Sequence, residues 1–284
     1  MDNKRPILLL GSRGLLGSEI AKVYQNQNLY CIDKDDIDVT DKLLVNNLIM
    51  DVNPQMVINA AAYTNVDEAE RNQCLADKVN AEAVSHLAKI CKSLRIILVH
   101  YSTDYVFGGE QMGYLESDIP KKPINYYGES KLLGEIVLRK YNNMFYLIRL
   151  SSLFGLSGIN FVDKMLDLAE DKQELKIVND QYFKPTYAPD LAKATKNLLD
   201  EKPEFGVYHL TNEGITTWHS FAKSIFHSRE KLTNKKSPKI IPCSSNEFRT
   251  LAKRPKYSIL LNTKFHFLRH WRMALEDYLK IRLA

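Results

Sequence analysis

The sequence predicts an α/β protein whose larger part is a doubly wound parallel sheet and whose smaller part is an α/β lobe. Two observations lead to this fold class. Over the first two-thirds of the 284 residues, short apolar runs alternate with longer segments of helical period, and after Arg149 this rhythm changes. Successive parallel strands need a crossover helix between them, so a regular alternation of strand and helix is typical of such a sheet.

Each expected strand is a short and largely apolar run. We expect strands at residues 7–10, 29–33, 56–59, 96–102 and 145–150. The segments between them carry apolar residues at helical spacing, which predicts helices near 16–25, 43–50, 75–93 and 128–140. Each helix follows one strand and precedes the next, as a doubly wound sheet requires.

The rest of the chain is organised differently. A Gly/Ser-rich loop at 151–158 precedes a helix near 161–170, a short strand near 176–179 and a helix near 190–199. Further helices are expected near 218–229 and 271–279, with an exposed loop around 233–238. We therefore assign residues 1–150 to the main domain, with 176–202 returning to it, and residues 151–175 and 203–284 to the smaller lobe.

Composition and charge narrow the class of protein. Hydrophobic residues make up 45% and charged residues 26%, the range of an ordinary soluble globular protein, and no apolar run has membrane-spanning length. A cytoplasmic protein with four reduced cysteines is therefore expected. The net charge is +5, but residues 229–284 hold 14 Lys and Arg against 4 Asp and Glu. This basic part points to an anionic partner such as a substrate diphosphate, or to a solvated basic face; no nucleic-acid motif is present.

A glycine-rich turn follows the first expected strand and opens the first expected helix. It reads Gly11-Ser12-Arg13-Gly14-Leu15-Leu16-Gly17. Glycines at this spacing let the backbone turn tightly and approach a pyrophosphate, and the helix N-terminus supplies free N–H groups. The turn predicts a dinucleotide-binding main domain. Asp33, at the end of the second strand, favours the ribose hydroxyls of NADH, whereas Lys34 suits the 2′-phosphate of NADPH, so both cofactors stay open.

A tyrosine and a lysine four residues apart form the expected chemical centre. Tyr127 and Lys131 share one helix face, and a cation near a phenol stabilises its ionised form, which makes the phenol a useful acid or base. The same spacing also occurs at Tyr30/Lys34 and Tyr278/Arg282, so spacing alone is weak evidence. The position of Tyr127 is what counts, because it follows the fourth strand, where Thr103 is expected to point its hydroxyl into the same crevice. A carbonyl oxygen placed between Thr103 and Tyr127 would complete a reduction site.

Further motifs follow one another along the whole chain. They are Asn59-Ala60-Ala61-Ala62-Tyr63-Thr64 with Val66-Asp67 and Ala69-Glu70, His100-Tyr101-Ser102-Thr103-Asp104-Tyr105-Val106-Phe107, Tyr127-Gly128 with Ser130-Lys131-Leu132 and Gly134-Glu135, Asn160-Phe161, Asn179-Asp180-Gln181, Pro185-Thr186-Tyr187, Asp190-Leu191-Ala192 and Arg254-Pro255-Lys256-Tyr257-Ser258. In these segments the chain resembles the dTDP-4-dehydrorhamnose reductase family of the extended short-chain dehydrogenases. The resemblance covers essentially the full length.

The resemblance implies a Rossmann domain with a substrate-binding lobe, and NADPH or NADH as cofactor. The implied reaction reduces the C4 keto group of a nucleotide-linked 4-keto-6-deoxyhexose, dTDP-4-dehydro-L-rhamnose to dTDP-L-rhamnose, for cell-surface polysaccharide. Tyr127 would donate the proton, Lys131 would lower its pKa and bind the nicotinamide ribose, and Thr103 would polarise the carbonyl. Besides Gly11, Gly17 and Lys131, the cofactor residues would be Gly14, Leu15, Leu16, Asp33, Asp38, Val39, Ala61, Ala62 and Tyr63. The substrate residues would be Thr103, Asp104, Tyr127, Asn160 and Arg254.

Two departures from the family pattern leave the sugar open. The family commonly reads Arg-Thr-Ser-Trp where this chain reads Arg149-Leu150-Ser151-Ser152, and it has glycine where this chain has Phe183. A dehydratase is disfavoured because Tyr105, and not glutamate, follows Asp104. An epimerase and a non-catalytic regulatory subunit similar to that of methionine adenosyltransferase stay as alternatives. No metal site is expected, and the oligomeric state, with a homodimer as one option, stays open.

Overall fold

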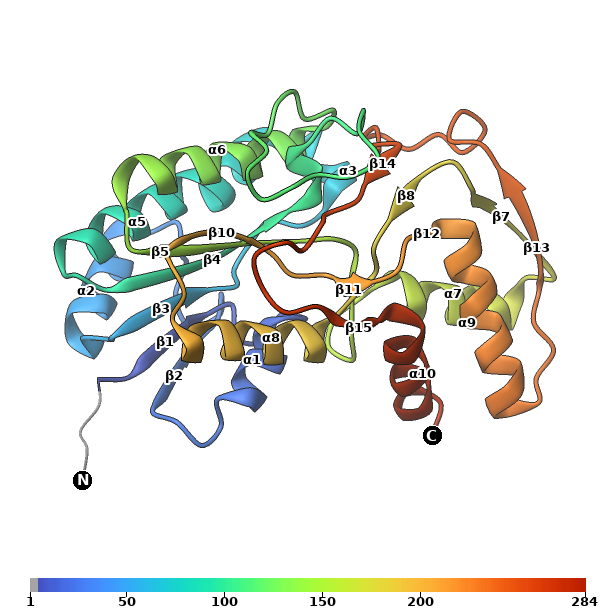
Figure 1. Ribbon diagram of the computed structural model, residues 1–284, viewed down its shortest axis with the longest axis horizontal. Coiled ribbons are helices and arrows are strands. Elements are labelled where there is room, and N and C mark those ends of the chain that lie inside the picture. Colours follow the sequence, from blue (N-terminus) through green and yellow to red (C-terminus); the bar gives the residue numbers. More distant parts are fainter. Residues whose placement is uncertain (1–4) are drawn as a thin grey trace.

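The computed structural model describes residues 5–284, so the first four residues of the predicted main domain lie outside the described part. Its centre is a parallel six-stranded sheet with the order β10-β5-β4-β3-β1-β2 (Figure 1). The strands are β1 (Ile7–Leu10), β2 (Leu29–Ile32), β3 (Met56–Asn59), β4 (Ile97–Thr103), β5 (Phe145–Leu150) and β10 (Gly206–His209). The strand order reverses at β1, which pairs with β2 on one side and β3 on the other, and ligands bind beyond the strand ends at such a reversal.

Helices cover both faces of this sheet, as Figure 1 shows. They are α1 (Gly17–Val23) and α8 (Ala188–Glu201) on one face, and α2 (Lys42–Val52), α5 (Ala83–Ser93) and α6 (Tyr126–Tyr141) on the other. Successive strand residues alternate between the faces, so Leu9 packs with α1 and α8 while Leu8 and Leu10 pack on the opposite side. Both faces are buried, which explains why the strands are continuous apolar runs.

The helix that precedes α5 contains a π-helical turn. Helix α4 (Gln73–Asp77) continues through η1 (Lys78–Glu82) into α5, and the short helix α3 (Val66–Ala69) lies just before it. In η1 the side chain of Asn80 is buried and bonds the backbone of Tyr63 in both directions, accepting from its N–H at 2.9 Å and donating to its carbonyl at 3.0 Å. Asn80 also donates to Ser130 on α6 at 2.9 Å. The π-turn therefore fixes the chain after β3 against helix α6.

The smaller lobe has its own apolar core. Its helices are α7 (Phe161–Asp171), α9 (Trp218–Thr233) and α10 (Trp271–Arg282). Its short strands pair as β7 (Glu174–Val178) with β13 (Lys239–Cys243), β12 (Thr216–Thr217) with β8 (Tyr182–Phe183) and β14 (Tyr257–Ser258), β11 (Asn212–Glu213) with β15 (Leu268–His270), and β6 (Leu153–Phe154) with β9 (Thr186–Tyr187). Large rings fill the core, with Phe221 packed edge-on against Trp271 at 5.3 Å. The lobe lies beside the carboxyl ends of the main strands (Figure 1).

The structure confirms the predicted fold class and corrects two predicted boundaries. The strand expected at 176–179 is β7, which pairs with β13 in the lobe and does not return to the main sheet. Conversely, residues 206–209 form β10 and pair in parallel with β5, so this part of 203–284 belongs to the main sheet. Helix α8, within the predicted returning segment 176–202, does pack on the main sheet. Membership in a sheet is decided by distant partners, which a four- or five-residue strand does not specify.

Candidate active site

A cavity of about 510 Å³ lies between the carboxyl ends of the strands and the lobe. From the sheet side it is lined by residues that follow β1, β3, β4 and β5, and by Tyr127 and Lys131 of α6. From the lobe side it is lined by Gly158, Ile159, Gln181, Phe183, Trp218, Pro255 and Ser258. The predicted cofactor residues and the predicted chemical centre thus line one cavity, at the reversal of strand order and beside the lobe.

The glycine-rich turn fits a dinucleotide. Gly11 has φ +78°, and a Cβ there would lie 2.7 Å from the backbone nitrogen of Ala61, so only glycine is tolerated. At Gly17 a Cβ would lie 1.9 Å from the carbonyl oxygen of Gly11, which keeps helix α1 close to the turn. Gly14, with Leu15 and Leu16, faces the cavity. This bare backbone cradle beside the cavity is where a pyrophosphate would lie.

The structure brings Asp33 to this turn. Its carboxylate accepts from the backbone N–H of Arg13 at 2.7 Å and from that of Lys34 at 2.8 Å. The Arg13 guanidinium pairs with Asp35 and Asp36 at the surface. Of the other predicted cofactor residues, Ala62 lines the cavity, while Ala61 and Tyr63 flank it in the chain. Asp38 and Val39 lie beyond the cavity lining, with the Asp38 carboxylate accepting from Thr40.

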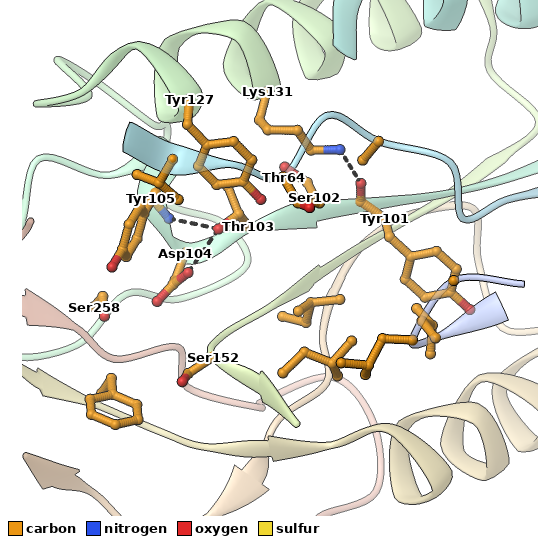
Figure 2. Close-up of a pocket in the computed structure, with 18 of the residues that line it drawn as sticks. Thr64, Tyr101, Ser102, Thr103, Asp104, Tyr105, Tyr127, Lys131, Ser152 and Ser258 are labelled. Atoms are coloured by element: carbon orange, nitrogen blue, oxygen red, sulfur yellow. Dashed lines mark hydrogen bonds between the residues drawn. The ribbon is translucent and has the colours of Figure 1, made fainter. Parts of the chain in front are cut away.

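Thr103 and Asp104 lie where β4 ends and the 3₁₀ turn η2 (Asp104–Val106) begins. The Thr103 oxygen accepts from the backbone N–H of Tyr105 at 3.2 Å, which caps this turn. The Thr103 hydroxyl donates to the Asp104 carboxylate at 2.8 Å. Both side chains are buried and line the cavity (Figure 2). The strand end thus fixes a hydroxyl and a carboxyl side by side at the cavity wall.

Helix α6 places Tyr127 and Lys131 directly above this strand end, as Figure 2 shows. Asn125 caps the helix by accepting from the N–H of Gly128 at 2.8 Å. Gly128 is required because a Cβ there would lie 2.2 Å from the carbonyl oxygen of Tyr105. The helix can therefore approach the chain after β4 closely, and Tyr127 lies beside Thr103 (Figure 2). Burial raises the pKa of Tyr127 to about 12, while a hydrogen bond from Thr103 lowers it.

Lys131 does not bring the pKa of Tyr127 below its ordinary value, as its expected role required. The Lys131 ammonium donates to the carbonyl oxygen of Tyr101 at 2.7 Å (Figure 2). Burial lowers the pKa of Lys131 to about 8, while the nearby Glu135 raises it. The pKa of Tyr127 stays above its ordinary value, so the tyrosine is a neutral phenol here. A neutral phenol is the form that donates a proton, and this suits reduction better than oxidation.

Behind Lys131 lies a buried ion pair that sequence reasoning missed. The Glu135 carboxylate accepts two bonds from the Arg149 guanidinium, at 2.8 and 2.7 Å, and one from the Ser102 hydroxyl at 2.7 Å. Both charged side chains are almost fully buried. Arg149 also contacts the His209 ring nitrogen at 3.3 Å. Glu135 follows Lys131 by four residues on α6, so one helix face carries the tyrosine, the lysine and this pair.

Two predicted substrate residues have other partners in this structure. Arg254 forms a bidentate pair with Asp67, with nitrogen–oxygen distances of 2.8 and 2.7 Å. Asn160 caps helix α7 and donates to the carbonyl oxygen of Gly155 at 2.8 Å. Neither lines the cavity, although their neighbours Pro255 and Ile159 do. Contacts from these two side chains to a substrate would therefore require them to leave or share their present partners.

The two departures from the family pattern both line the cavity. Ser152 has φ +41° and lines the cavity after β5. Phe183 is buried and lies 4.0 Å, between ring centroids, from Trp218. The indole of Trp218 donates to the side chain of Gln181 at 3.0 Å, which fixes the ring. This chain therefore builds an aromatic wall from Phe183 and Trp218, facing a small Ser152.

Residues 5–284 contain neither a metal-binding cluster nor a membrane-spanning helix. No group of three or more His, Cys, Asp or Glu side chains in this part of the chain is arranged to hold a metal ion. No helix among these residues is both long and apolar enough to span a membrane.

Known proteins resemble this chain over nearly its whole length. The family model described as the RmlD substrate binding domain matches residues 4–283. The chain is 37% identical over 270 residues to dTDP-4-dehydrorhamnose reductase of Aggregatibacter actinomycetemcomitans, covering 91% of each protein. It is 32% identical over 277 residues to dTDP-4-keto-6-deoxy-D-glucose reductase of Streptomyces niveus, covering 94% of each.

A solved structure supports the same relationship. The crystal structure of dTDP-4-dehydrorhamnose reductase from Bacillus anthracis in complex with NADP superposes with a TM-score of 0.91 at 34% identity, covering 98% of this chain and 99% of that one. The family model, the sequence relatives and the solved structure all point to the same family. The chain therefore belongs to the dTDP-4-dehydrorhamnose reductase family of the extended short-chain dehydrogenases.

Proposed function

We propose that this protein reduces the C4 keto group of dTDP-4-dehydro-L-rhamnose to give dTDP-L-rhamnose, with NADPH or NADH as reductant. The observation that carries the proposal is the convergence of Thr103, Tyr127 and Lys131 on one cavity beside the glycine-rich turn. The relatives named above are reductases of dTDP-linked keto sugars, and one was crystallised with NADP. The product would serve the synthesis of cell-surface polysaccharide.

The proposed cofactor site runs from the glycine-rich turn to Lys131. Gly11, Gly14 and Gly17 would leave room for the pyrophosphate, and Asp33 would face the adenine ribose. Lys131 would hold the nicotinamide ribose. When bound, the reduced cofactor supplies the hydride. The protein contributes position and a proton.

The proposed proton donor is Tyr127. Its buried, neutral phenol carries a proton at physiological pH, because burial raises its pKa to about 12. Thr103 would hold the same carbonyl oxygen from the other side, in the way that an oxyanion site does. Lys131 keeps positive charge near the phenol and would stabilise the phenolate formed when the proton leaves.

The proposal is tested by mixing the purified protein with NADPH or NADH and enzymatically prepared dTDP-4-dehydro-L-rhamnose. We expect consumption of the reduced cofactor and formation of dTDP-L-rhamnose, identified by mass spectrometry and by NMR of C4. Absence of both above background with either cofactor would disprove a reductase. It would favour the non-catalytic regulatory subunit, which binds nucleotides without turnover.

A second candidate substrate is the 4-keto-6-deoxy-D-glucose form of the dTDP sugar. The Streptomyces relative carries this substrate in its name, and Ser152 and Phe183 change the wall that would face the sugar ring. Parallel assays with both sugars distinguish the two, because the preferred substrate has the larger kcat/KM. Product without net oxidation of the cofactor would point instead to an epimerase or a dehydratase.

A cytoplasmic location and a homodimer are also proposed. Cell fractionation with an antibody to the protein tests the first. Light scattering coupled to size-exclusion chromatography tests the second, with a 32.7 kDa chain as the monomer reference.

A further inference from the structure

The Asp104 carboxyl faces hydroxyl groups. It accepts from Thr103 Oγ1 at 2.8 Å and from Ser151 Oγ at 2.6 Å, and it is 3% exposed. The Ser258 hydroxyl, on β14 of the lobe, also bonds to it. Phenols lie near it as well: Tyr105 in its own turn and Tyr127 on α6. Arg254 and Asp67, which pair with each other, act electrostatically on Tyr105.

These surroundings bring the pKa of Asp104 toward neutral pH. Burial raises its pKa to about 6, while the hydroxyls of Ser151, Ser258 and Thr103 lower it. A carboxyl in this range exchanges its proton near neutral pH. Asp104 and Ser258 line the cavity, so solvent in the cavity can supply a proton.

The Thr103 hydroxyl connects Asp104 to Tyr127. A hydroxyl has one proton to donate and two lone pairs that accept. In this structure the proton points to Asp104, while a hydrogen bond from Thr103 to Tyr127 is also within reach and lowers the pKa of the phenol. One proton cannot serve both partners at once. The hydroxyl therefore has two possible directions, one toward the carboxyl, which is the bond drawn in Figure 2, and one toward the phenol.

The proposed reaction takes one proton from Tyr127 in every turnover, so the tyrosine must be reprotonated before the next one. Resting on that proposed function, we propose that Asp104 returns this proton to Tyr127 through the Thr103 hydroxyl, and that Ser151 positions Asp104. The Asp104 O–H bond breaks as its proton passes to Thr103 Oγ1, and the Thr103 proton passes to the phenolate oxygen. A carboxylic acid and a phenolate become a carboxylate and a phenol, no electrons are transferred, and Asp104 then takes a proton from solvent.

Proton transfer from Asp104 to Tyr127 is thermodynamically favourable. A carboxylic acid is a far stronger acid than a phenol, so transfer from Asp104 to the phenolate is favourable. Ser151, which is fully buried after β5, donates to the carboxylate and so orients it toward Thr103. It acts through Asp104 and is a positioning residue.

The test separates the first turnover from later ones. In Asp104→Asn, Tyr127 still begins protonated, so the first reduction per active site should proceed near the wild-type rate. Later turnovers should be about 100-fold slower, the size of a lost proton-transfer step. Stopped-flow absorbance of the reduced cofactor should therefore show a burst of one equivalent per site. Equal slowing of the first and later turnovers, a raised KM with an unchanged kcat, or no change would each overturn the relay.

Further variants guard against misfolding and assay failure. Ser151→Ala should give the same burst with a smaller loss, and Ser151→Thr should restore the rate because the hydroxyl is kept. Asp51→Asn and Ser93→Ala, both exposed and outside the cavity lining, should behave as wild type. Infrared spectra of the protein alone should show a carboxylic acid band that titrates near pH 6 and is lost in Asp104→Asn. If the wild type reduces neither sugar, the proposed function fails; if it does and no burst appears, only the relay fails.

Discussion

The sheet wall of the cavity, formed by β4 and α6, presents buried polar groups fixed by hydrogen bonds, whereas the lobe wall presents aromatic rings. On the sheet wall, Thr103 and Lys131 are bonded to neighbouring backbone and side chains and have almost no exposure. On the lobe wall, the rings of Phe183 and Trp218 pack in a tilted arrangement with their centroids 4.0 Å apart. From this difference we expect the sheet wall to perform the proton chemistry of the proposed reaction and the lobe wall to select its substrate. Changes on the first should lower kcat, and changes on the second should alter the preference between sugars.

The largest effect is expected at the sheet wall. Tyr127→Phe removes the phenolic proton and keeps the ring that packs edge-on against Tyr105 at 6.1 Å. We expect kcat to fall about 10²–10⁴-fold, the usual contribution of a general acid. Binding of the reduced cofactor, measured by its fluorescence, should stay near wild type. An unchanged kcat would assign the proton to another group.

The next largest effect is expected at the buried ion pair of Glu135 and Arg149, behind the sheet wall. Glu135→Gln leaves the Arg149 guanidinium without its charged partner in the interior. Removing one member of a buried ion pair destabilises a protein by about 3–5 kcal/mol. Urea denaturation should show this loss, whereas Glu129→Gln, on the exposed side of the same helix, should change stability by less than about 0.5 kcal/mol. Similar losses in both variants would contradict the ranking.

These two cases also show what the sequence made predictable. Strand ends and helix spacing together indicated that Thr103, Tyr127 and Lys131 share a crevice, because those features are local. The Arg149–Glu135 pair, the Arg254–Asp67 pair and strand β10 depend on partners far apart in sequence, and no local pattern encodes them. The π-turn at Asn80 was missed for another reason: one extra residue in a helical turn barely changes the apolar spacing. A polar Asn80 inside a helix was the available signal.

The pH dependence of kcat/KM tests whether Glu135, of the Glu135–Arg149 pair, influences Lys131. The pKa of Lys131 is lowered to about 8 by burial and raised by Glu135, so the ammonium loses its proton as pH rises through this range. We expect kcat/KM to fall about tenfold per pH unit above that point, because the neutral amine no longer stabilises the phenolate. In Glu135→Gln the negative charge is gone, and the fall should begin at lower pH. Profiles that coincide in the two proteins would show that another group titrates.

The smallest effect is expected at the lobe wall, where it should appear as a change in preference. Phe183→Leu keeps an apolar side chain and should lower stability by about 1–2 kcal/mol, because the smaller side chain leaves part of the core unfilled. Because Phe183 packs on Trp218 and lines the cavity across from Ser152, the lost ring should widen the sugar pocket. A wider pocket should change the ratio of kcat/KM for the two dTDP keto sugars about 10-fold, with the pH profile unmoved, since neither Lys131 nor Asp104 is touched. Rate measurements on both sugars at several pH values separate the outcomes. An equal loss for both sugars would place Phe183 among the residues that support the lobe, and a displaced profile would show that the two walls do not act independently.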